Sequence, residues 1–355
     1  MRPSNHKFGM NDYKKGAELA EKYNNRYAAE IMGVHPRTIR KWKAIVKKEK
    51  LADEFTVEDY PTGNEPIGDL IENRIKKFAL KSKAKNHERL INVRINIDGP
   101  IGIAHFGDPH IDDDGTNIAA LLAHANLVQD TPGMFGGNIG DNQNNWIGRL
   151  ARLYGEQSTS AQESWRLTEH FITLVDWLYL VGGNHDAWSG AGDPLEWMVS
   201  QKAGIFNNNG VRINLIFPNK KQVRINARHT FAGHSMWNTA HGISKAVQMG
   251  WRDHVLTAGH THVSGYQVLK DPASGLVSHA IRIASYKEQD RYAEEKGLPD
   301  QNIFKCPVTI IDPQYADDDC RLVTTIFDPY EGAEYLTWKR ERYDSSTKTN
   351  KKPNR

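Results

Sequence analysis

Five apolar segments of this chain each end in a short turn that carries Asp, Asn or His, usually directly after glycine. The segments are AHFGDPH (104–110), FGGNIGDNQNN (135–145), LYLVGGNHD (178–186), TFAGHS (230–235) and LTAGHTH (256–262). Glycine lets the backbone turn sharply where an apolar strand ends. In open α/β folds, ligand sites form beyond the carboxyl ends of the strands. The pattern therefore predicts an α/β fold in which these strand ends share one site.

The segments between and around these turns support the α/β class. Residues 158–175 (STSAQESWRLTEHFITLV) predict a helix with a Ser/Thr cap and an acidic first turn. Further strands are expected in INVRINID (91–98), IGIAHF (101–106), DWLYLVGG (176–183), HVLTAGH (254–260) and SHAIRIASY (278–286). The first two are separated by a short Gly-Pro turn, which predicts a hairpin. Strands with interleaved helices indicate mixed sheets rather than a bundle.

Composition excludes several classes of protein. The longest apolar run, FITLVDWLYLV (171–181), is interrupted by Asp176 and is far shorter than the roughly 20 residues of a membrane helix. The first 16 residues lack the apolar core of a signal peptide. Cys306 and Cys320 are too few for a disulfide framework or a thiolate zinc site. A cytoplasmic protein with two unpaired thiols and no membrane partner is expected.

Charge is distributed unevenly along the chain. Residues 1–50 contain 13 Lys and Arg but 5 Asp and Glu, whereas the whole chain contains 46 and 43. The last 18 residues contain 7 Lys and Arg and 2 Asp and Glu. A basic head and a basic tail thus flank an acidic middle, which suggests contact with nucleic acid at one or both ends. For residues 344–355, a solubilising tail is an equally good interpretation.

Residues 13–50 predict short helices. Pro36 stands near a helix start, and Ile39, Trp42, Ile45 and Val46 share one face of that helix. Gly33 precedes it at a natural turn, so the pattern is helix, turn, helix with a basic outer face. The alternative is an amphipathic helical hairpin whose charges are only solvated.

The string AAEIMGVHPRTIRKWK (28–43) resembles the helix-turn-helix of small DNA-binding modules in transposases and phage packaging proteins. In such modules the second helix enters the major groove. The resemblance implies that DNA is a partner, and that the contacting residues are Arg37, Thr38, Arg40, Lys41 and Lys43.

The expected domain organisation has four parts. Residues 1–55 form the helix-turn-helix domain, and residues 56–92 form a linker with a helix, because YPTGNEPIGD (60–69) breaks regular structure. Residues 93–338 form the α/β domain, and residues 339–355 form a basic, disordered tail.

The polar residues of the five turns suit a pair of metal ions. Carboxylate oxygens, imidazole nitrogens and one amide oxygen, with no thiolate, favour zinc, manganese or iron. Two divalent ions about 4 Å apart need a bridging carboxylate and a bridging water.

The ordered motifs resemble the calcineurin-like metallophosphoesterases. They are D-x-H at Asp108 and His110, G-D at Gly140–Asp141, G-N-H-D at 183–186, the lone His234, and G-H-x-H at 259–262. The resemblance covers about residues 98–290 and implies a four-layer α/β/β/α sandwich with two metals at the strand ends. It implies that Asp108, His110, Asp141 and His262 hold one metal. Asp141 would bridge to a second metal, which Asn184, His234 and His260 would complete.

Two details of the resemblance involve a choice between residues. His229 lies five residues before His234, and His234 is preferred because AGHS fits a turn at a strand end better than ARHT. Asn144, Asn145 and Arg149 follow Asp141, where the family often places substrate contacts. The Asp-Arg pair of the protein phosphatases and the His of the double-strand-break-processing exonucleases are both absent at 144–145, so no subfamily is assigned.

The family's chemistry implies hydrolysis of a phosphoester by in-line attack of a metal-bridging hydroxide. His185 would be the catalytic histidine and would protonate the leaving alkoxide, and Asp186 would orient it. Mn²⁺ is the expected metal, with Zn²⁺, Fe²⁺, Ni²⁺ and Mg²⁺ as alternatives.

The combination of this site with a helix-turn-helix resembles proteins of phages and mobile elements, and favours a DNA-directed nuclease or phosphodiesterase; a phage protein would act in the host cytoplasm. A small-molecule phosphodiesterase or phosphomonoesterase is one alternative. A DNA-binding regulator with a vestigial metal site is another.

Overall fold

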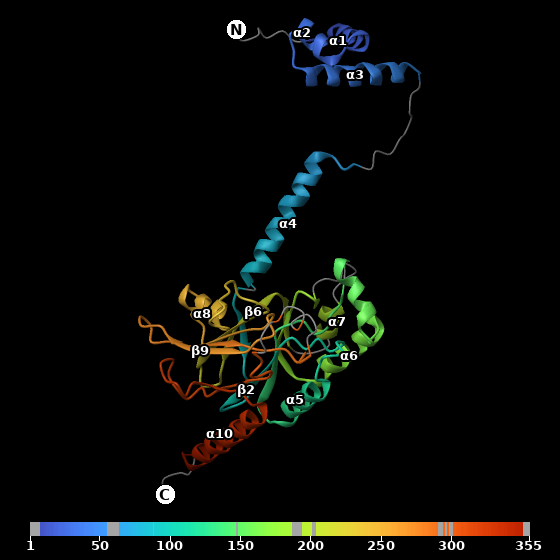
Figure 1. The fold of residues 1–355 in the computed structure, drawn as a ribbon. Helices are drawn as coiled ribbons and strands as arrows, with labels where there is room; N and C mark the ends of the chain where they lie inside the picture. Colours follow the sequence, from blue (N-terminus) through green and yellow to red (C-terminus); the bar gives the residue numbers. More distant parts are fainter. Residues whose placement is uncertain are drawn as a thin grey trace. The chain divides into compact units, whose positions relative to one another are not determined.

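The computed structural model describes residues 8–54, 64–87, 89–146, 148–186, 194–200, 204–289 and 301–350, together with Glu294 and Gly297. The chain divides into two compact units, Met1–Lys77 and Phe78–Arg355. Figure 1 traces the helices and strands of both units.

The smaller unit contains three packed helices, α1 (Met10–Lys22), α2 (Asn25–Ile31) and α3 (Pro36–Glu54). Their core is formed by Ala20, Ala28, Ala29, Ile39 and Trp42. Asn24 caps α2 by accepting hydrogen bonds from two backbone N–H groups, and α3 begins at the expected proline. Gly33 between α2 and α3 has a φ of 67°, a conformation that favours glycine. DNA binding by this unit stays a prediction. The helix α4 (Ile67–His87) follows in the chain.

Within the described residues, the larger unit contains two six-stranded sheets. The first sheet has the order β1 (Ile91–Arg94), β6 (Gly210–Ile216), β7 (Gln222–Arg228), β8 (Val255–Ala258), β10 (Val277–Arg282), β9 (Gly265–Lys270). The second has the order β12 (Val323–Ile326), β11 (Val308–Ile311), β2 (Ile101–Phe106), β3 (Met134–Asn138), β4 (Trp177–Gly182), β5 (Ile205–Asn208).

Strand direction brings the predicted site residues to one edge of each sheet. In the second sheet β2, β3 and β4 run parallel, so their carboxyl ends point the same way. In the first sheet β7 and β8 also run parallel. These five strands are the ones that precede the five turns identified in the sequence.

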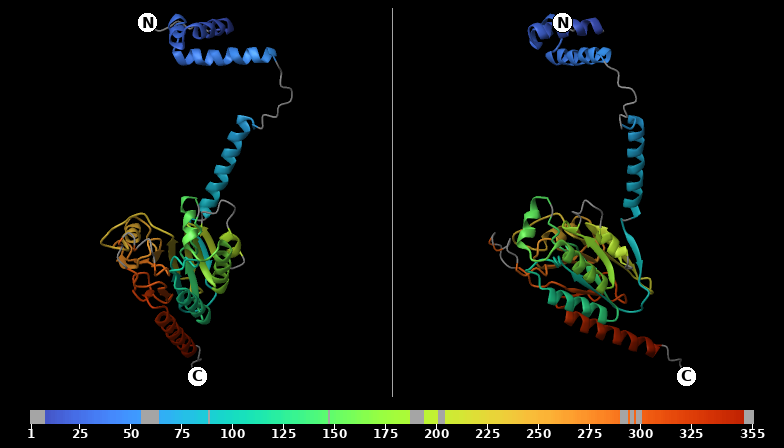
Figure 2. Two further views of the ribbon diagram at one scale, coloured as in Figure 1. Left: turned by 45° about the vertical axis from the view of Figure 1, so that its right-hand side comes forward. Right: turned by 90° about the vertical axis from the view of Figure 1, so that its right-hand side faces the viewer.

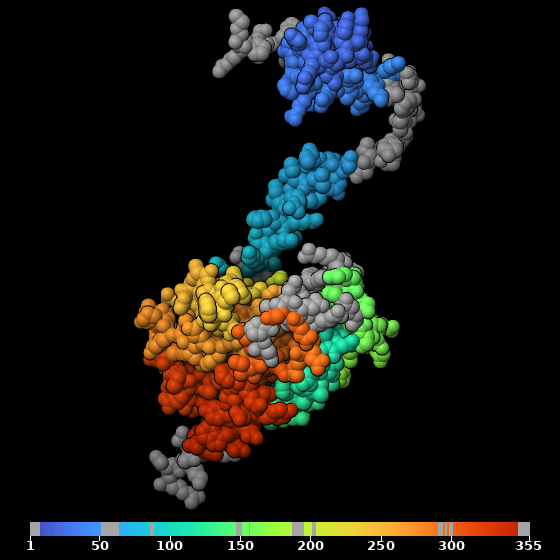
Figure 3. Space-filling model, viewed as in Figure 1, coloured from blue at the N-terminus to red at the C-terminus, as the bar shows by residue number. Residues whose placement is uncertain are grey.

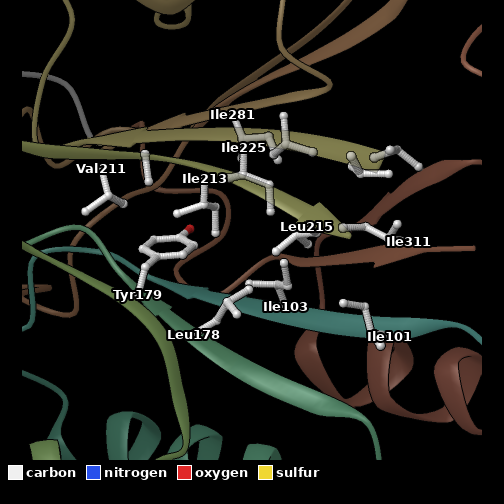
Figure 4. Packing of buried hydrophobic residues seen from close by; sticks show 14 of the residues in the cluster. Ile101, Ile103, Leu178, Tyr179, Val211, Ile213, Leu215, Ile225, Ile281 and Ile311 are labelled. Atoms are coloured by element: carbon white, nitrogen blue, oxygen red, sulfur yellow. The ribbon is translucent and has the colours of Figure 1, made fainter. Parts of the chain in front are cut away.

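The two sheets pack face to face over an apolar core. Ile101 and Ile103 of β2 point into this core together with Tyr179 of β4, and they face Ile213 and Ile225 of the first sheet (Figure 4). Ala104 and Phe106 of β2 belong to a separate cluster on the other face of the same sheet. Because successive side chains of a strand point to opposite faces, β2 is buried on both sides.

Helices cover the outer faces of both sheets. Their bounds are α5 (Ile118–Asp130), α6 (Ala161–Leu174), α7 (Pro194–Ser200), α8 (His241–Gln248) and α10 (Pro329–Asn350), with a 3₁₀ helix η1 at Gly148–Glu156. The helices α5, α6, α7 and α10 cover the second sheet, and both views of Figure 2 show α5 and α10 side by side. The helix α8 covers the first sheet, where it contacts β8, β9 and β10. The surface around this helix is yellow to orange in Figure 3. The four-layer α/β/β/α sandwich is therefore confirmed.

Some local predictions are also confirmed. Ser160 caps α6 and forms a capping box with Glu163, as the Ser/Thr-rich start of that helix suggested. Both cysteines are free: Cys306 is buried and Cys320 is exposed. No helix among the described residues combines the length and the apolar character that crossing a membrane requires.

Two local predictions are wrong. Residues 91–98 and 101–106 do not form a hairpin, because β1 pairs in parallel with β6 of the first sheet while β2 pairs with β3 and β11 of the second. The Gly-Pro turn carries the chain from one sheet to the other.

A disordered tail from residue 339 is not observed either, since α10 continues to Asn350. Its basic residues find partners in the domain: Lys339 lies 2.8 Å from Asp312 Oδ2, and Arg340 donates to the carbonyl of Pro100 at 2.6 Å. Residues 351–355 lie outside the described part of the chain.

Candidate metal centre

The turns after β2, β3, β4, β7 and β8 bring seven polar side chains together where the two sheets meet. Asp108 and His110 follow β2, Asp141 follows β3, Asn184 follows β4, His229 follows β7, and His260 and His262 follow β8. The second sheet supplies the first four of these residues and the first sheet supplies the three others. The site therefore exists only when the two sheets are packed against each other.

The backbone at these positions has an unusual conformation. Asp108, His110, Asp141, His260 and His262 all have positive φ values, between 32° and 70°. Non-glycine residues seldom adopt this left-handed region, and such strain gathers at functional sites. Most of the non-glycine positive-φ residues in the described part of the chain are thus candidate ligands.

Two glycines allow the close approach of the strand ends. A Cβ atom at Gly183 would lie 2.1 Å from Asp141 Oδ1, and one at Gly259 would lie 2.5 Å from Asp108 Oδ2. Both distances are far below van der Waals contact. The glycines before Asn184 and His260 are therefore required because carboxylates occupy the space that a side chain would fill.

Three donor atoms lie around Nε2 of His229 and form a group of four with it. The amide oxygen of Asn184 lies 2.9 Å from this nitrogen, Nδ1 of His260 lies 3.0 Å from it, and Oδ2 of Asp141 lies 3.1 Å from it. Asp141 and His229 are buried, whereas His260 is exposed. An amide oxygen, a carboxylate oxygen and two imidazole nitrogens form a ligand set for a divalent cation such as zinc or manganese.

A second group of donors shares Asp141 with the first. Nε2 of His110 lies 3.2 Å from Nε2 of His262, and the donor atoms of His110, Asp141 and His185 all lie within 4.8 Å of one another. Asp141 belongs to both groups of donors. A carboxylate shared by two groups is the arrangement that a dinuclear metal site needs.

The position expected for His234 is taken by His229. The ring of His229 is buried among the other candidate ligands, whereas His234 is exposed. The preference for His234 rested on the glycine before it and is wrong, because His229 follows β7 directly and needs no glycine turn to reach the site. The signal in the sequence was the end of β7, which places His229 at the strand tip.

Contacts around the cluster fit a bound cation. Nδ1 of His229 lies 2.9 Å from the carbonyl oxygen of Ile139, so Nδ1 donates to that carbonyl and Nε2 faces the cluster. Metal-binding histidines usually donate their second nitrogen in this way. Oδ1 of Asp108 is buried and has no hydrogen-bond partner among the described residues. An unsatisfied buried carboxylate oxygen is costly unless a cation or a donor reaches it.

The pKa values describe the charge in this cluster without metal. Burial raises the pKa of Asp108 to about 6. Burial would also raise the pKa of Asp141, but the hydrogen bond and the charge of His229 lower it below its usual range. Burial would lower the pKa of His229, but its contact with Asp141 raises it to about 9. A metal ion would replace that proton, because a ligand imidazole must be neutral.

His185 lies beside the cluster and is held by the backbone. Its Nδ1 lies 2.5 Å from the carbonyl oxygen of Asn144, and its backbone N–H donates to Oδ1 of Asp141 at 2.9 Å. Its ring meets the rings of His110 and Trp146 edge to face, with centroids 5.0 and 5.3 Å apart. A carbonyl can only accept, so Nδ1 carries a proton and Nε2 is the atom that can exchange one.

Asp186 was expected to orient His185, but its carboxylate contacts the backbone of the turns. It accepts from the N–H groups of Asp141 at 2.7 Å, Gly183 at 2.9 Å and Asn142 at 3.1 Å. Burial, with a contribution from Asp141, raises its pKa to about 6. Asp186 therefore ties the turn after β4 to the turn after β3, and the group at Nδ1 of His185 is the Asn144 carbonyl.

The three candidate substrate residues have different surroundings. Asn144 is fully buried, and its side chain donates to Asp113 at 2.9 Å, so it supports His185 from within the protein. Asn145 donates to the carbonyl oxygen of His185 at 2.8 Å. The side chain of Arg149 lies outside the described part of the structure.

Two supporting residues carry no motif that the sequence could reveal. Arg282 of β10 is buried and donates to the carbonyl of Gly259 at 2.7 Å and to Thr261 Oγ1 at 2.9 Å. Ser285 donates to the carbonyl oxygen of Asp108 at 2.6 Å. Both fix turns that hold candidate ligands, and both stand in a segment that the sequence marks only as a strand.

No protein-family model matches the chain, and no curated protein matches it in sequence. Solved structures resemble it weakly. Vps29 from Entamoeba histolytica, in a complex with zinc, is 12% identical, with 64% of this chain and 97% of that chain covered and a TM-score of 0.31. The calcineurin-like phosphoesterase YfkN from Bacillus subtilis is 11% identical (70% and 98% covered, TM-score 0.32). The 5′-nucleotidase from Candida albicans is 12% identical (67% and 53% covered, TM-score 0.32). Because these TM-scores are low, the similarity assigns no activity to this chain. What the candidate site can do is inferred from the residues of this chain alone.

Proposed function

We propose that this chain is a metal-dependent phosphoesterase of the calcineurin-like type, and that it hydrolyses phosphodiester bonds in DNA. The observation that carries the proposal is the position of Asp141 between two groups of donor atoms. The proposed ligands are Asp108, His110, Asp141 and His262 for one metal, and Asp141, Asn184, His229 and His260 for the other.

Bound divalent cations would neutralise the phosphoryl oxygens and activate water for attack on phosphorus. The protein's own contribution is to orient the substrate and to supply a proton. Nδ1 of His185 is held by the Asn144 carbonyl, and Nε2 is the nitrogen proposed to protonate the leaving oxygen. Trp146 packs against the ring of His185 and its indole N–H donates to Gln157 at 2.9 Å, so the ring has little room to turn.

The choice of DNA as substrate rests on the smaller unit. Arg37, Arg40 and Lys41 are exposed on α3, while Thr38 and Lys43 of the same helix are half-buried. Ile39 and Trp42 between them are buried, so the helix presents a basic face outward and an apolar face inward. Such a face supplies the charge that binds phosphate backbones.

The function is tested with purified protein and Mn²⁺. The substrates are bis(p-nitrophenyl) phosphate, p-nitrophenyl phosphate, and single- and double-stranded DNA. Asp141→Asn removes one charge from the shared carboxylate, and Asp130→Asn is the matched control, because Asp130 is exposed at the end of α5. The proposal expects hydrolysis of the diester and of DNA that Asp141→Asn abolishes and Asp130→Asn retains.

Other outcomes contradict parts of the proposal. Hydrolysis of the monoester alone would identify a phosphomonoesterase, and hydrolysis of the diester without DNA would identify a small-molecule phosphodiesterase. No hydrolysis with any divalent metal would contradict the enzymatic function and leave a DNA-binding protein with a vestigial site.

A further inference from the structure

The most exposed large apolar side chains in the described part of the chain lie on two loops. Trp237 is 95% exposed, Met236 is 83% exposed and Ile303 is 81% exposed. A tryptophan usually buries most of its ring, since the ring removes a large apolar area from water. A nearly bare tryptophan beside a bare methionine therefore indicates a binding surface.

Both loops are attached to Ser264, two residues after the candidate ligand His262. Thr239, two residues after Trp237, donates its hydroxyl to the carbonyl oxygen of Ser264 at 2.7 Å. The backbone N–H of Ile303 donates to Oγ of Ser264 at 2.9 Å. Both loops are therefore anchored close in sequence to the turn that carries His260 and His262.

The Trp237 loop is also attached to the metal centre at its other end. It begins directly after His229, whose ring lies within the ligand cluster. The loop runs from the candidate ligand His229 to Thr239, which is hydrogen-bonded to Ser264 near the candidate ligand His262. The position of Trp237 relative to the centre is therefore restricted from both sides.

Charge near the loop suits an anionic ligand. Residues 197–252 contain no Asp or Glu and contain eight Lys and Arg. Some of these cations are paired: Arg212 and Arg224 contact Asp253, and Lys221 contacts Asp317. Lys245 of α8 is exposed, and its Cδ would lie 3.3 Å from a Cβ atom at Gly233 of the loop. A loop with an exposed apolar ring, a cation beside its backbone and no carboxylate of its own matches a base attached to a phosphate.

We propose that Trp237, with Met236 and Ile303 at its side, stacks on an unpaired nucleobase of the DNA strand whose phosphodiester lies at the metal centre. The inference rests on the proposed phosphodiesterase function and adds single-stranded DNA as the preferred form of the substrate. Duplex DNA keeps its bases inside the helix, so a stacking residue selects single strands or frayed ends. Trp146 cannot take this role, because it is half-buried, packs on His185 and bonds to Gln157.

Binding of labelled oligonucleotides in the presence of chelator tests the inference without hydrolysis. The probes are an oligothymidylate and an abasic oligonucleotide of the same length. The proteins are wild type, Trp237→Ala, Trp237→Phe and the control Trp197→Ala, since Trp197 is 62% exposed on α7. Loss of one stacked base weakens binding about tenfold. Trp237→Ala should therefore weaken oligothymidylate binding about tenfold and leave abasic binding unchanged, while Trp237→Phe and Trp197→Ala should bind like wild type.

Two results would overturn the inference. One is equal affinity of wild type and Trp237→Ala for oligothymidylate. The other is a change in the oligomeric state of Trp237→Ala with no loss of oligonucleotide affinity, which would identify the apolar surface as a contact between copies of the chain. Hydrolysis of bis(p-nitrophenyl) phosphate with Mn²⁺ tests the proposed function separately. Wild-type hydrolysis combined with unchanged binding by Trp237→Ala contradicts only the stacking role, whereas absent hydrolysis contradicts the enzymatic function.

Discussion

The amide oxygen of Asn184 lies 2.9 Å from Nε2 of His229, although the two residues follow strands of different sheets. The contact joins the end of β4 to the end of β7 across the apolar core between the sheets. Asp141 makes the same kind of contact from β3 to His229 at 3.1 Å. The candidate ligands are therefore positioned by the packing of the sheets as well as by the individual turns.

Replacing His185 separates proton transfer from metal binding. His185→Ala should lower kcat on single-stranded DNA by about 10²–10⁴-fold, because the leaving alkoxide then lacks its proton donor. The loss on bis(p-nitrophenyl) phosphate should be smaller, since p-nitrophenolate is stable without a proton. Steady-state kinetics on both substrates measure the difference, and His170→Ala is the control because His170 is exposed on α6. Equal losses on both substrates would show that His185 does not act as a general acid.

The buried His105 makes stability depend on pH. Its ring nitrogens contact the Tyr179 hydroxyl at 2.7 Å and the Thr309 hydroxyl at 2.8 Å in the core between the sheets. Burial lowers the pKa of His105 from 6.5 to about 3. Between these values the unfolded chain binds the proton and the folded chain does not. The stability that the folded chain gains from burying His105 as a neutral ring is therefore present above pH 6.5 and is lost as the pH falls towards 3.

Urea unfolding of metal-free protein at several pH values measures this effect. The free energy of unfolding of wild type should fall by about 1.4 kcal/mol for each pH unit below 6.5 through His105. His105→Gln should be less stable at pH 7 but should have a shallower pH dependence. His170→Gln should keep the wild-type slope, because His170 is exposed. A His105→Gln slope equal to that of wild type would contradict the assignment.

The DNA-binding role of α3 is tested by salt dependence. Arg37→Ala combined with Arg40→Ala should weaken duplex binding and lower the slope of log K against log[salt] by about 0.9 for each phosphate that the protein no longer neutralises. The matched double variant, Lys15→Ala with Lys22→Ala, removes two exposed cations of α1. If both double variants lose affinity equally, the smaller unit binds DNA only through its net charge.

The sequence predicted which residues come together in most of the candidate metal site, because each candidate ligand follows an apolar strand within a few residues. Asp108, His110, Asp141, Asn184, His260 and His262 all lie together in the structure. The local pattern was sufficient there, since a parallel strand fixes the direction of its carboxyl end. The positive φ values of Asp108, His110, Asp141, His260 and His262 were not predictable, because non-glycine residues rarely adopt them.

The remaining errors concern contacts between distant parts of the chain. His229 and His234 follow the same strand, and only the packing of the first sheet against the second decides which ring is buried in the site. The backbone carbonyl of Asn144 holds His185, and no side-chain pattern encodes a carbonyl contact. The charge of the tail predicts disorder, but Lys339 forms a buried ion pair with Asp312, 27 residues earlier in the chain.

The metal content of the purified protein tests the central claim most directly. After equilibration with Mn²⁺ and removal of free metal, elemental analysis of wild type should find two ions per chain. His229→Ala should retain about one, because His229 is the centre of the group formed with Asn184 and His260. His234→Ala should retain two, because His234 is exposed. A wild type without bound metal, or a loss in His234→Ala with none in His229→Ala, would contradict the account.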